Sequence, residues 1–324
     1  MNVLVSSMDE KGGFAVYHLA ADGTLTERKK VEMPAVMYGC QHKDRFYFSL
    51  REPFAEAQSA VASLSCRADT FESNIVPCNG SIACHISVSP NGQKLYTANY
   101  RSGSISEFHL DDSGNILKLN RVIPLPFPHK DSVPHAHGVF FIQNKEILCV
   151  PDLGNDCVYF YPYDKDGIGE PTGSIAFPQG SGPRHIAVSS DEKTVYVVAQ
   201  NSCQVFAISE TGQIVSCVST CVQKGSQASA IRMSKDGNFL YVSNRGTNTI
   251  SVISVEGEKM KLINQVPCGN NPRDFALSPD GKWLVVGNMD DDTVAVYSVH
   301  TSSGDLKFHS QYSFKMPVSV MFTS

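Results

Sequence analysis

Arginine and histidine stand side by side at the head of a strand-like segment of this chain. In "SGPRHIAVS", Arg184 and His185 precede the alternating run Ile-Ala-Val-Ser. Comparable words place charged or titratable residues at the same point: His85 in "ACHISVSP", His137 in "PHAHGVFF", and Arg273 with Asp274 in "NPRDFALSP". Arginine presents a planar fork of donors that suits carboxylate and phosphate oxygens, and histidine exchanges a proton near neutral pH. Together these residue types could bind a small anion and move a proton on it.

The elements that position these residues come from an internal repeat. The words "SPNGQKLYTANY", "SSDEKTVYVVAQ", "SKDGNFLYVSNR" and "SPDGKWLVVGNM" each combine a turn with a strand. Seven strands of this kind, spaced 43 to 52 residues apart, are anchored on Val3, Phe46, Leu95, Ile147, Val195, Leu240 and Leu284. Each is followed by further runs with period-two alternation, such as "GSISEFHL" and "DTVAVYSV". Four short strands in every 40–50 residues are typical of a propeller blade.

The sequence therefore predicts an all-β fold, a seven-bladed β-propeller with four antiparallel strands per blade. The whole chain, residues 1–324, is expected to form this one domain. The final segment "PVSVMFTS" resembles the strand that precedes every other anchor, and the chain begins with an anchor strand, "NVLVSS". We expect the N- and C-terminal strands to share one blade and to close the ring, which hides its sheet edges.

Antiparallel pairing predicts where the chemically capable residues meet. The innermost strand of each blade should begin ten residues before its anchor, and the anchor strand should end five residues after it. We call the expected starts of the innermost strands the first column and the expected ends of the anchor strands the second column. The first column contains Val36, His85, His137, His185, Ala230 and Asp274, with Cys84, Arg184 and Arg273 one position earlier. The second column contains Met8, Arg51, Tyr100, Asp152, Gln200, Arg245 and Met289. We expect the polar members of both columns to converge on one mouth of the central channel, the default place for a ligand. Four arginines against two aspartates make this mouth cationic and favour a small anion.

At these residues the chain resembles the seven-bladed propeller lactonases of the 6-phosphogluconolactonase type, which are related to the carboxymuconate-cyclising enzymes. The resemblance covers the whole length and rests on "PHAHGV", "PDLGND", "GPRHIAV", "LYVSNRGTNTISV" and "NPRDFALSPDG". It implies a reaction centre at His137 and Arg184, with Arg245 nearby. The family glutamate is replaced by Gln200, and Ala230 stands where a second glutamate is common.

The resemblance implies a cofactor-free hydrolase for an anionic sugar lactone such as 6-phosphogluconolactone. Arg184 would stabilise the negative charge that develops on the carbonyl oxygen, and His137 would accept the proton of the attacking water. Gln200 can orient water or substrate but cannot take a proton. The remaining candidates are expected to bind substrate: Arg51, His85, Tyr100, Asp152, His185, Arg245, Arg273 and Asp274. Two alternatives stay open, a carboxymuconate-type cycloisomerase and a non-catalytic propeller that binds an anion or a partner.

The composition argues against several classes of binding partner. A net charge of −5 argues against nucleic acid, which requires a basic surface, and no apolar run is long enough to span a membrane. No metal is expected, because calcium requires more oxygen ligands than these columns supply. The run from Asp290 to Asp292 is expected to be a solvated turn. Ten cysteines without C-x-x-C spacing, in a chain without a signal peptide, favour reduced thiols and a cytoplasmic monomer.

Overall fold

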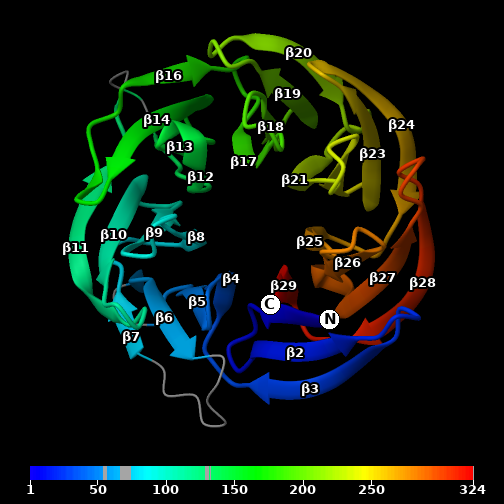
Figure 1. The fold of residues 1–324 in the computed structure, drawn as a ribbon, viewed down its shortest axis with the longest axis horizontal. Helices are drawn as coiled ribbons and strands as arrows, with labels where there is room; N and C mark the ends of the chain where they lie inside the picture. The colour runs from blue at the N-terminus through cyan, green and yellow to red at the C-terminus, as the bar shows by residue number, and fades with distance from the viewer. Residues whose placement is uncertain (54–56, 66–73, 128–130, 132, 324) are drawn as a thin grey trace.

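The computed structural model describes residues 1–53, 57–65, 74–127, 131 and 133–323. Seven antiparallel sheets are arranged as the blades of a ring around a central channel (Figure 1). Each blade has four main strands, and blade 4 has a fifth, short one. The strands run outward from the channel in chain order, apart from those of the blade that closes the ring. The predicted seven-bladed propeller is confirmed.

The strands of each blade are given from the channel outward. Blade 1 contains β29 (Pro317–Thr323), β1 (Asn2–Ser7), β2 (Gly13–Leu19) and β3 (Leu25–Val31). Blade 2 contains β4 (Val36–His42), β5 (Arg45–Leu50), β6 (Ala60–Ser65) and β7 (Asn74–Pro77). Blade 3 contains β8 (Ala83–Val88), β9 (Lys94–Asn99), β10 (Ser104–Leu110) and β11 (Ile116–Pro124). Blade 4 contains β12 (Phe140–Ile142), β13 (Ile147–Asp152), β14 (Cys157–Asp164) and β16 (Gly173–Ala176), with the short β15 (Gly167–Ile168) also paired to β14.

The other three blades follow the same order. Blade 5 contains β17 (Pro183–Val188), β18 (Val195–Ala199), β19 (Gln204–Ile208) and β20 (Ile214–Ser219). Blade 6 contains β21 (Gln227–Met233), β22 (Phe239–Arg245), β23 (Thr249–Glu256) and β24 (Lys259–Pro267). Blade 7 contains β25 (Pro272–Leu277), β26 (Trp283–Asn288), β27 (Thr293–Val299) and β28 (Leu306–Ser313). Two single-turn 3₁₀ segments, η2 (Gln143–Lys145) and η3 (Met289–Asp291), lie in turns.

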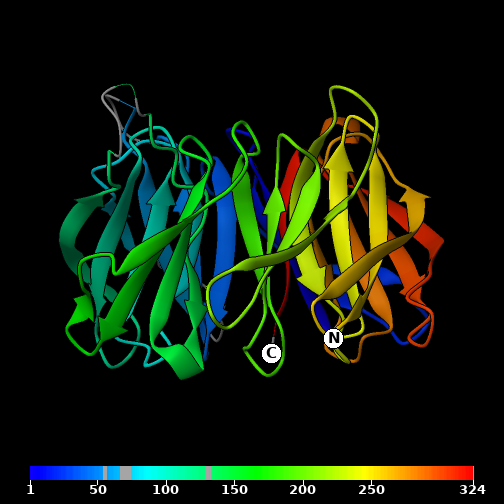
Figure 2. The ribbon, with the colours of Figure 1, turned by 90° about the horizontal axis from the view of Figure 1, so that it is seen from above.

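The two ends of the chain close the ring together. Strand β29 pairs antiparallel with β1, and Val320 lies opposite Val5. Both termini lie on the same face of the disc (Figure 2), which we call the terminus face. This face also carries the turns between the first and second strands of blades 2 to 7. The opposite face, the mouth face, carries the starts of the innermost strands and the turns after the second strands.

The hydrophobic core lies between neighbouring blades. In one cluster, Tyr96 and Ile105 of blade 3 pack with Leu148 and Val150 of blade 4. The second strands are buried nearly throughout, as in β9 and β26, whereas the residues of an outermost strand such as β24 are exposed or half-buried. Each fully buried large apolar side chain contributes roughly 1.5–3 kcal/mol relative to an exposed one. Stacked blades thus form a rigid frame whose inner ends point at the channel.

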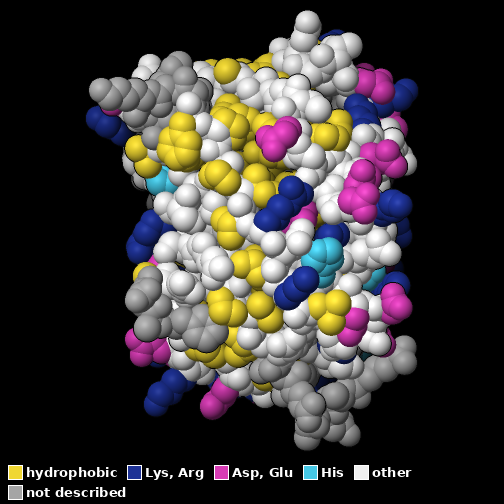
Figure 3. All heavy atoms as spheres, turned by 90° about the vertical axis from the view of Figure 1, so that its left-hand side faces the viewer, with side chains coloured by type: hydrophobic (Ala, Val, Ile, Leu, Met, Phe, Trp, Pro, Cys, Tyr) yellow, Lys and Arg dark blue, Asp and Glu magenta, His cyan; other side chains and the backbone are white. Residues whose placement is uncertain are grey.

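The outer wall is mixed in character. On the side occupied by β7 and β11, hydrophobic side chains are interspersed with charged ones (Figure 3). Leu117 of β11 is among the exposed hydrophobic residues. Among the described residues, no helix has the length and apolar character needed to cross a membrane.

Candidate active site

A β-bulge near the start of the innermost strand positions the candidate residues. In blade 5, Pro183 pairs with Ala199 and His185 with Val198, so that Arg184 is the extra, unpaired residue. Because a bulge adds one residue, two consecutive side chains can face the channel instead of alternating. The same register shift occurs in blades 3 and 7, where it leaves Cys84 and Arg273 as the extra residues.

The register in two blades corrects the expected columns. In blade 4, Ala136 bridges to Asp152, so His137 is equivalent to Cys84 and Arg184 and not to His85. The anchor Ile147 is therefore wrong by one residue, and Leu153 takes the channel position expected of Asp152. In blade 2, Tyr38 pairs with Ser49 and is equivalent to His85, so the expected position Val36 is wrong by two residues. The paired residues Tyr38 and Ser49 are 11 positions apart in the chain, two fewer than the equivalent pair His85 and Ala98 in blade 3.

Three arginines meet at the channel on the mouth face. Arg184 is 3% exposed, and its Nη1 donates to the carbonyl oxygen of Ser229 at 2.7 Å. Burial, together with the nearby charges of Arg245 and Arg273, holds the pKa of Arg184 well below its usual range. Burial and Arg273 likewise lower the pKa of Arg245 to about 10. In the described part of the chain, none of the three forms an ion pair with a carboxylate. We call this group, with Arg51, the arginine mouth.

His137 lies beside these arginines. Its side chain is buried, and its Nδ1 is 3.9 Å from Sγ of Cys84. Burial and the positive charge of Arg184 hold the pKa of His137 well below its ordinary value, so the ring is neutral at pH 7. The Tyr100 ring packs edge-on against His137 at 5.4 Å between centroids and stacks on His135 at 4.4 Å. Tyr100 therefore fixes the orientation of the His137 ring.

The other predicted mouth residues are less enclosed. Gln200 follows β18 on the mouth face. Its side-chain Nε2 donates a hydrogen bond to Oδ1 of Asn201 at 3.5 Å. Arg51 follows β5, and its Nη1 contacts Sδ of Met8 at 3.6 Å. The charge of Arg51 acts on Arg273 and, after burial, contributes to lowering the pKa of that arginine.

Asp152 is engaged by its own turn. Its Oδ1 accepts hydrogen bonds from the backbone N–H groups of His135 (2.8 Å), Gly154 (3.0 Å) and Asn155 (3.2 Å). Its Oδ2 accepts one more from the Asn155 side chain at 2.8 Å. The carboxylate is fully buried and holds together the loop that carries His137.

A layer of side chains closes the channel behind the arginine mouth. This plug consists of Tyr38, His85, Phe140, His185, Arg232 and Asp274. His185 lies 5.4 Å from His85 and 5.7 Å from Phe140 between ring centroids. Arg232 donates to the Asp274 carboxylate at 2.8 Å and to the Tyr38 hydroxyl at 3.0 Å. Burial holds the pKa of His85 near 3 and that of His185 well below its usual range, so both rings are neutral.

The plug depends on two small residues at its level. A Cβ on Gly138 would lie 2.2 Å from the Phe140 ring, so only glycine leaves room for that ring. Ala230, at the equivalent position of β21, is followed two residues later by Arg232. Phe140 and Arg232, each two residues after one of these small residues, therefore place their side chains in the plug.

The plug separates the arginine mouth from a cavity of about 910 Å³ on the terminus face. Tyr38, His85 and Arg232 line this cavity, and its rim includes Lys43 and Thr323. The structure therefore brings His137, Arg184, Arg245 and Arg273 together but turns His85 toward the opposite end of the channel. Asp274 is held inside the plug by Arg232.

Sequence reasoning missed three residues near the mouth or in the plug. Tyr38 and Arg232 fell outside the expected columns. Asp290 lies in an exposed turn, as expected, but it also lines a pocket of about 440 Å³ with Arg245 and Asn271, which was not predicted from the sequence. The Asn271 side chain donates to Asp290 at 3.0 Å, and the charge of Asp290 acts on Arg245 and Arg273. Its position at the end of a second strand, next to Met289 of the expected column, was the available signal.

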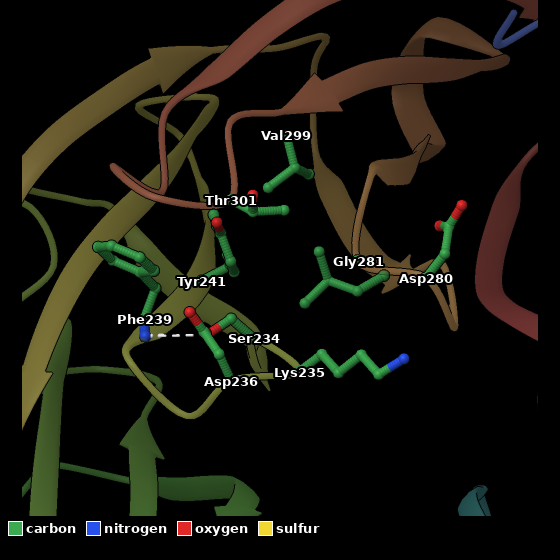
Figure 4. Close-up of a pocket in the computed structure, with 10 residues that line it drawn as sticks. Ser234, Lys235, Asp236, Phe239, Tyr241, Asp280, Gly281, Val299 and Thr301 are labelled. Atoms are coloured by element: carbon green, nitrogen blue, oxygen red, sulfur yellow. Dashed lines mark hydrogen bonds between the residues drawn. The ribbon is translucent and has the colours of Figure 1, made fainter.

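A separate pocket of about 380 Å³ lies between blades 6 and 7 (Figure 4). Phe239, Tyr241 and Val299 contribute apolar surface, and Lys235 and Asp280 lie at its edge. None of the predicted site residues lines it. The candidate active site is therefore the arginine mouth.

Known proteins share this architecture. The family model "Lactonase, 7-bladed beta-propeller" matches residues 2–322. The 6-phosphogluconolactonase of Bacillus subtilis is 30% identical over 297 residues, which cover 84% of this chain and 83% of that protein. A protein from Lactobacillus plantarum superposes with a TM-score of 0.91 at 27% identity, over 100% of this chain and 99% of that one. The periplasmic gluconolactonase PpgL of Pseudomonas aeruginosa shares the fold with a TM-score of 0.91 at 23% identity, over 100% and 99% of the chains. This chain belongs to the seven-bladed β-propeller lactonase family.

Proposed function

We propose that the protein hydrolyses a small anionic sugar lactone, of the 6-phosphogluconolactone type, in the arginine mouth without a cofactor. The observation that carries this proposal is the cluster of Arg184, Arg245 and Arg273, none of which has an ion-paired carboxylate among the described residues. Besides burial, the charge of Arg273 lowers the pKa of both Arg184 and Arg245, and that of Arg51 lowers the pKa of Arg273. Such a cluster favours a ligand with several anionic oxygens, because each charge-assisted hydrogen bond relieves this repulsion. Family membership and the relationship to the Bacillus subtilis enzyme support the reaction class.

In the proposed mechanism, Arg184 donates a hydrogen bond to the lactone carbonyl oxygen. Water attacks the carbonyl carbon while neutral His137 accepts its proton, and Arg184 stabilises the oxyanion of the tetrahedral intermediate. The intermediate collapses by breaking the bond from the carbonyl carbon to the ring oxygen. That oxygen takes the proton back from His137 as it becomes a hydroxyl group. The product is the open-chain hydroxy acid.

The remaining mouth residues are assigned by their place. Arg51, Arg245 and Arg273 would hold the phosphate or carboxylate, and Tyr100 would keep His137 in position. Gln200 would orient the attacking water, and His185 would form the floor beneath Arg184. We leave His85, Asp152 and Asp274 out of the substrate set, since their side chains are engaged in the plug or in the 152–155 turn.

A lactone panel tests this function. Acid release from 6-phosphogluconolactone, glucono-δ-lactone and δ-valerolactone is measured at constant pH against spontaneous hydrolysis. We expect acceleration of all three and the highest kcat/KM for the phosphorylated substrate. If every lactone decays at its spontaneous rate while 6-phosphogluconate binds in a calorimeter, the protein is an anion-binding propeller. The replacement of the family glutamate by Gln200 is the observation that favours this second function.

A further inference from the structure

The cavity on the terminus face, which we call the rear chamber, lies on the channel axis but on the far side of the plug from the arginine mouth. Its volume of about 910 Å³ is within the range of small-molecule sites. The first-to-second-strand turns of blades 2, 3, 4 and 7 form its rim together with the end of β29. It has no residue in common with the arginine mouth.

The floor of the rear chamber is aromatic and electrically neutral. Tyr38 stacks on His85 at 4.3 Å between centroids, and Phe140 lies 4.5 Å from His85 on another side. Among the described residues that form the floor, the charged one is Arg232 of the lining, and Asp274 neutralises it through a 2.8 Å ion pair. An anion would find no unpaired cation on this floor, so the chemistry here is opposite to that of the arginine mouth.

One hydrogen-bond donor on this floor is unused. The backbone N–H of Val139 donates to Nδ1 of His85 at 3.4 Å. Because the ring is neutral, accepting at Nδ1 places its single proton on Nε2. No acceptor for this Nε2–H is found among the described residues, and the His85 ring lines the chamber. A donor that faces the chamber without a protein partner is available to a ligand that supplies an acceptor.

The larger part of the wall surface is apolar, although polar side chains such as Ser87 also contribute. The apolar residues include Val88, Ile186, Val188, Met321 and Phe322 from the inner strands of three blades, and Val139, which precedes β12. Flat aromatic molecules pack well against such walls and against the faces and edges of floor rings. We propose that the rear chamber is a second ligand site, for a small uncharged aromatic compound with one hydrogen-bond acceptor directed at His85.

Fluorine NMR titration tests this site with two probes of similar shape. The first, 4-fluoroacetophenone, carries a carbonyl acceptor, and the second, 4-fluorocumene, does not. Ser87→Trp fills the chamber from β8, and Ser219→Trp makes the matched change on the exposed outer strand β20. His85→Phe keeps an aromatic ring but removes the donor. If Ser87→Trp does not fold, Val188→Trp fills the chamber from blade 5 instead.

We expect saturable binding of 4-fluoroacetophenone to the unmodified protein and to Ser219→Trp, and loss of binding of both probes in Ser87→Trp. His85→Phe should weaken 4-fluoroacetophenone by roughly 5- to 10-fold, the effect of one neutral hydrogen bond, and should leave 4-fluorocumene unchanged. Binding that survives filling of the chamber would overturn the proposal. So would equal affinity of 4-fluoroacetophenone for the unmodified protein and His85→Phe, or no saturable binding of either probe. These readouts do not depend on lactone hydrolysis.

Discussion

Arg184 and His185 are neighbours in the sequence and also in space, with Nη1 of the arginine 3.2 Å from both ring nitrogens of the histidine. In a regular strand their side chains would point to opposite faces. The bulge between Pro183 and His185 turns both toward the channel, where the guanidinium faces the mouth and the imidazole belongs to the plug. The two residues therefore connect the proposed reaction centre with the layer that supports it.

Replacing Arg184 tests its role at the carbonyl oxygen. We expect Arg184→Gln to lower kcat for 6-phosphogluconolactone by about 10²–10³-fold, the usual loss for one oxyanion donor. Arg101→Gln is the matched control, since Arg101 is on the same face but exposed and paired with Glu52. Steady-state kinetics on both variants measures the difference. Equal activity of the two variants would remove Arg184 from the mechanism.

Restoring the family carboxylate tests the consequence of Gln200. A glutamate there can accept a proton from water, so Gln200→Glu should raise kcat and extend activity toward acidic pH. Gln223→Glu makes the same charge change at an exposed position outside the mouth. A pH-stat series on the three proteins distinguishes them. A Gln200→Glu protein that is no faster than the Gln223→Glu control would contradict a role for this position in proton transfer.

The pH dependence of the unmodified protein should reflect His137. As a base it works only when neutral, and its lowered pKa keeps it neutral at pH values where an ordinary histidine is protonated. We therefore expect the acidic limb of kcat/KM to fall well below pH 6.5. Rates from pH 4 to 8, corrected for spontaneous hydrolysis, measure it. An acidic limb centred at 6.5 would show that another group is the base.

Acid stability should depend on the buried histidines. The pKa of His85 is about 3 in the folded state and about 6.5 when unfolded, so the unfolded chain binds more protons between these values. The contribution of His85 to the unfolding free energy is therefore fully present above pH 6.5. Below that pH it decreases by about 1.4 kcal/mol per pH unit. His85→Phe should make the fall in unfolding free energy between pH 6 and 4 shallower by that amount. Urea titrations at several pH values measure this, and parallel curves would contradict it.

Gly138 should be required by the plug. Gly138→Ala drives a methyl group into the Phe140 ring and should destabilise the fold by about 1–3 kcal/mol. Phe140→Leu gives the methyl group room, so the double variant should be less destabilised than the sum of the single changes. Thermal or urea unfolding of the four proteins measures this coupling. Additive effects would show that the ring moves aside freely.

The sequence predicted the blades better than the site, for physical reasons. Turn motifs and the period-two alternation of apolar and polar residues repeat along the chain, and the number of strands and the closure of the ring could be predicted from them. Bulges do not alter the pattern of apolar residues, and Arg184 therefore gave no sign that it was unpaired. In "NKEILCV", Ile147 and Leu148 are equally apolar, which hid the one-residue shift that makes Asp152 the last residue of β13 and puts Leu153 at the expected channel position. Tyr38 was missed because the turn after β4 is shorter, so that counting back from the anchor led to Val36 instead. Arg232 was missed because it lies two residues after the expected position, Ala230.

The plug divides the central channel into two parts, each of which opens at one face of the disc only. A molecule that enters past Arg273 cannot leave at the terminus face, because His185 and its neighbours fill the passage. If the proposed hydrolysis takes place in the arginine mouth, the hydroxy acid, which carries one more negative charge than its lactone, has to leave through the same cationic opening by which the lactone enters. Product release and substrate entry would then compete for a single opening, and the arginines proposed to bind the substrate would also slow release of the product.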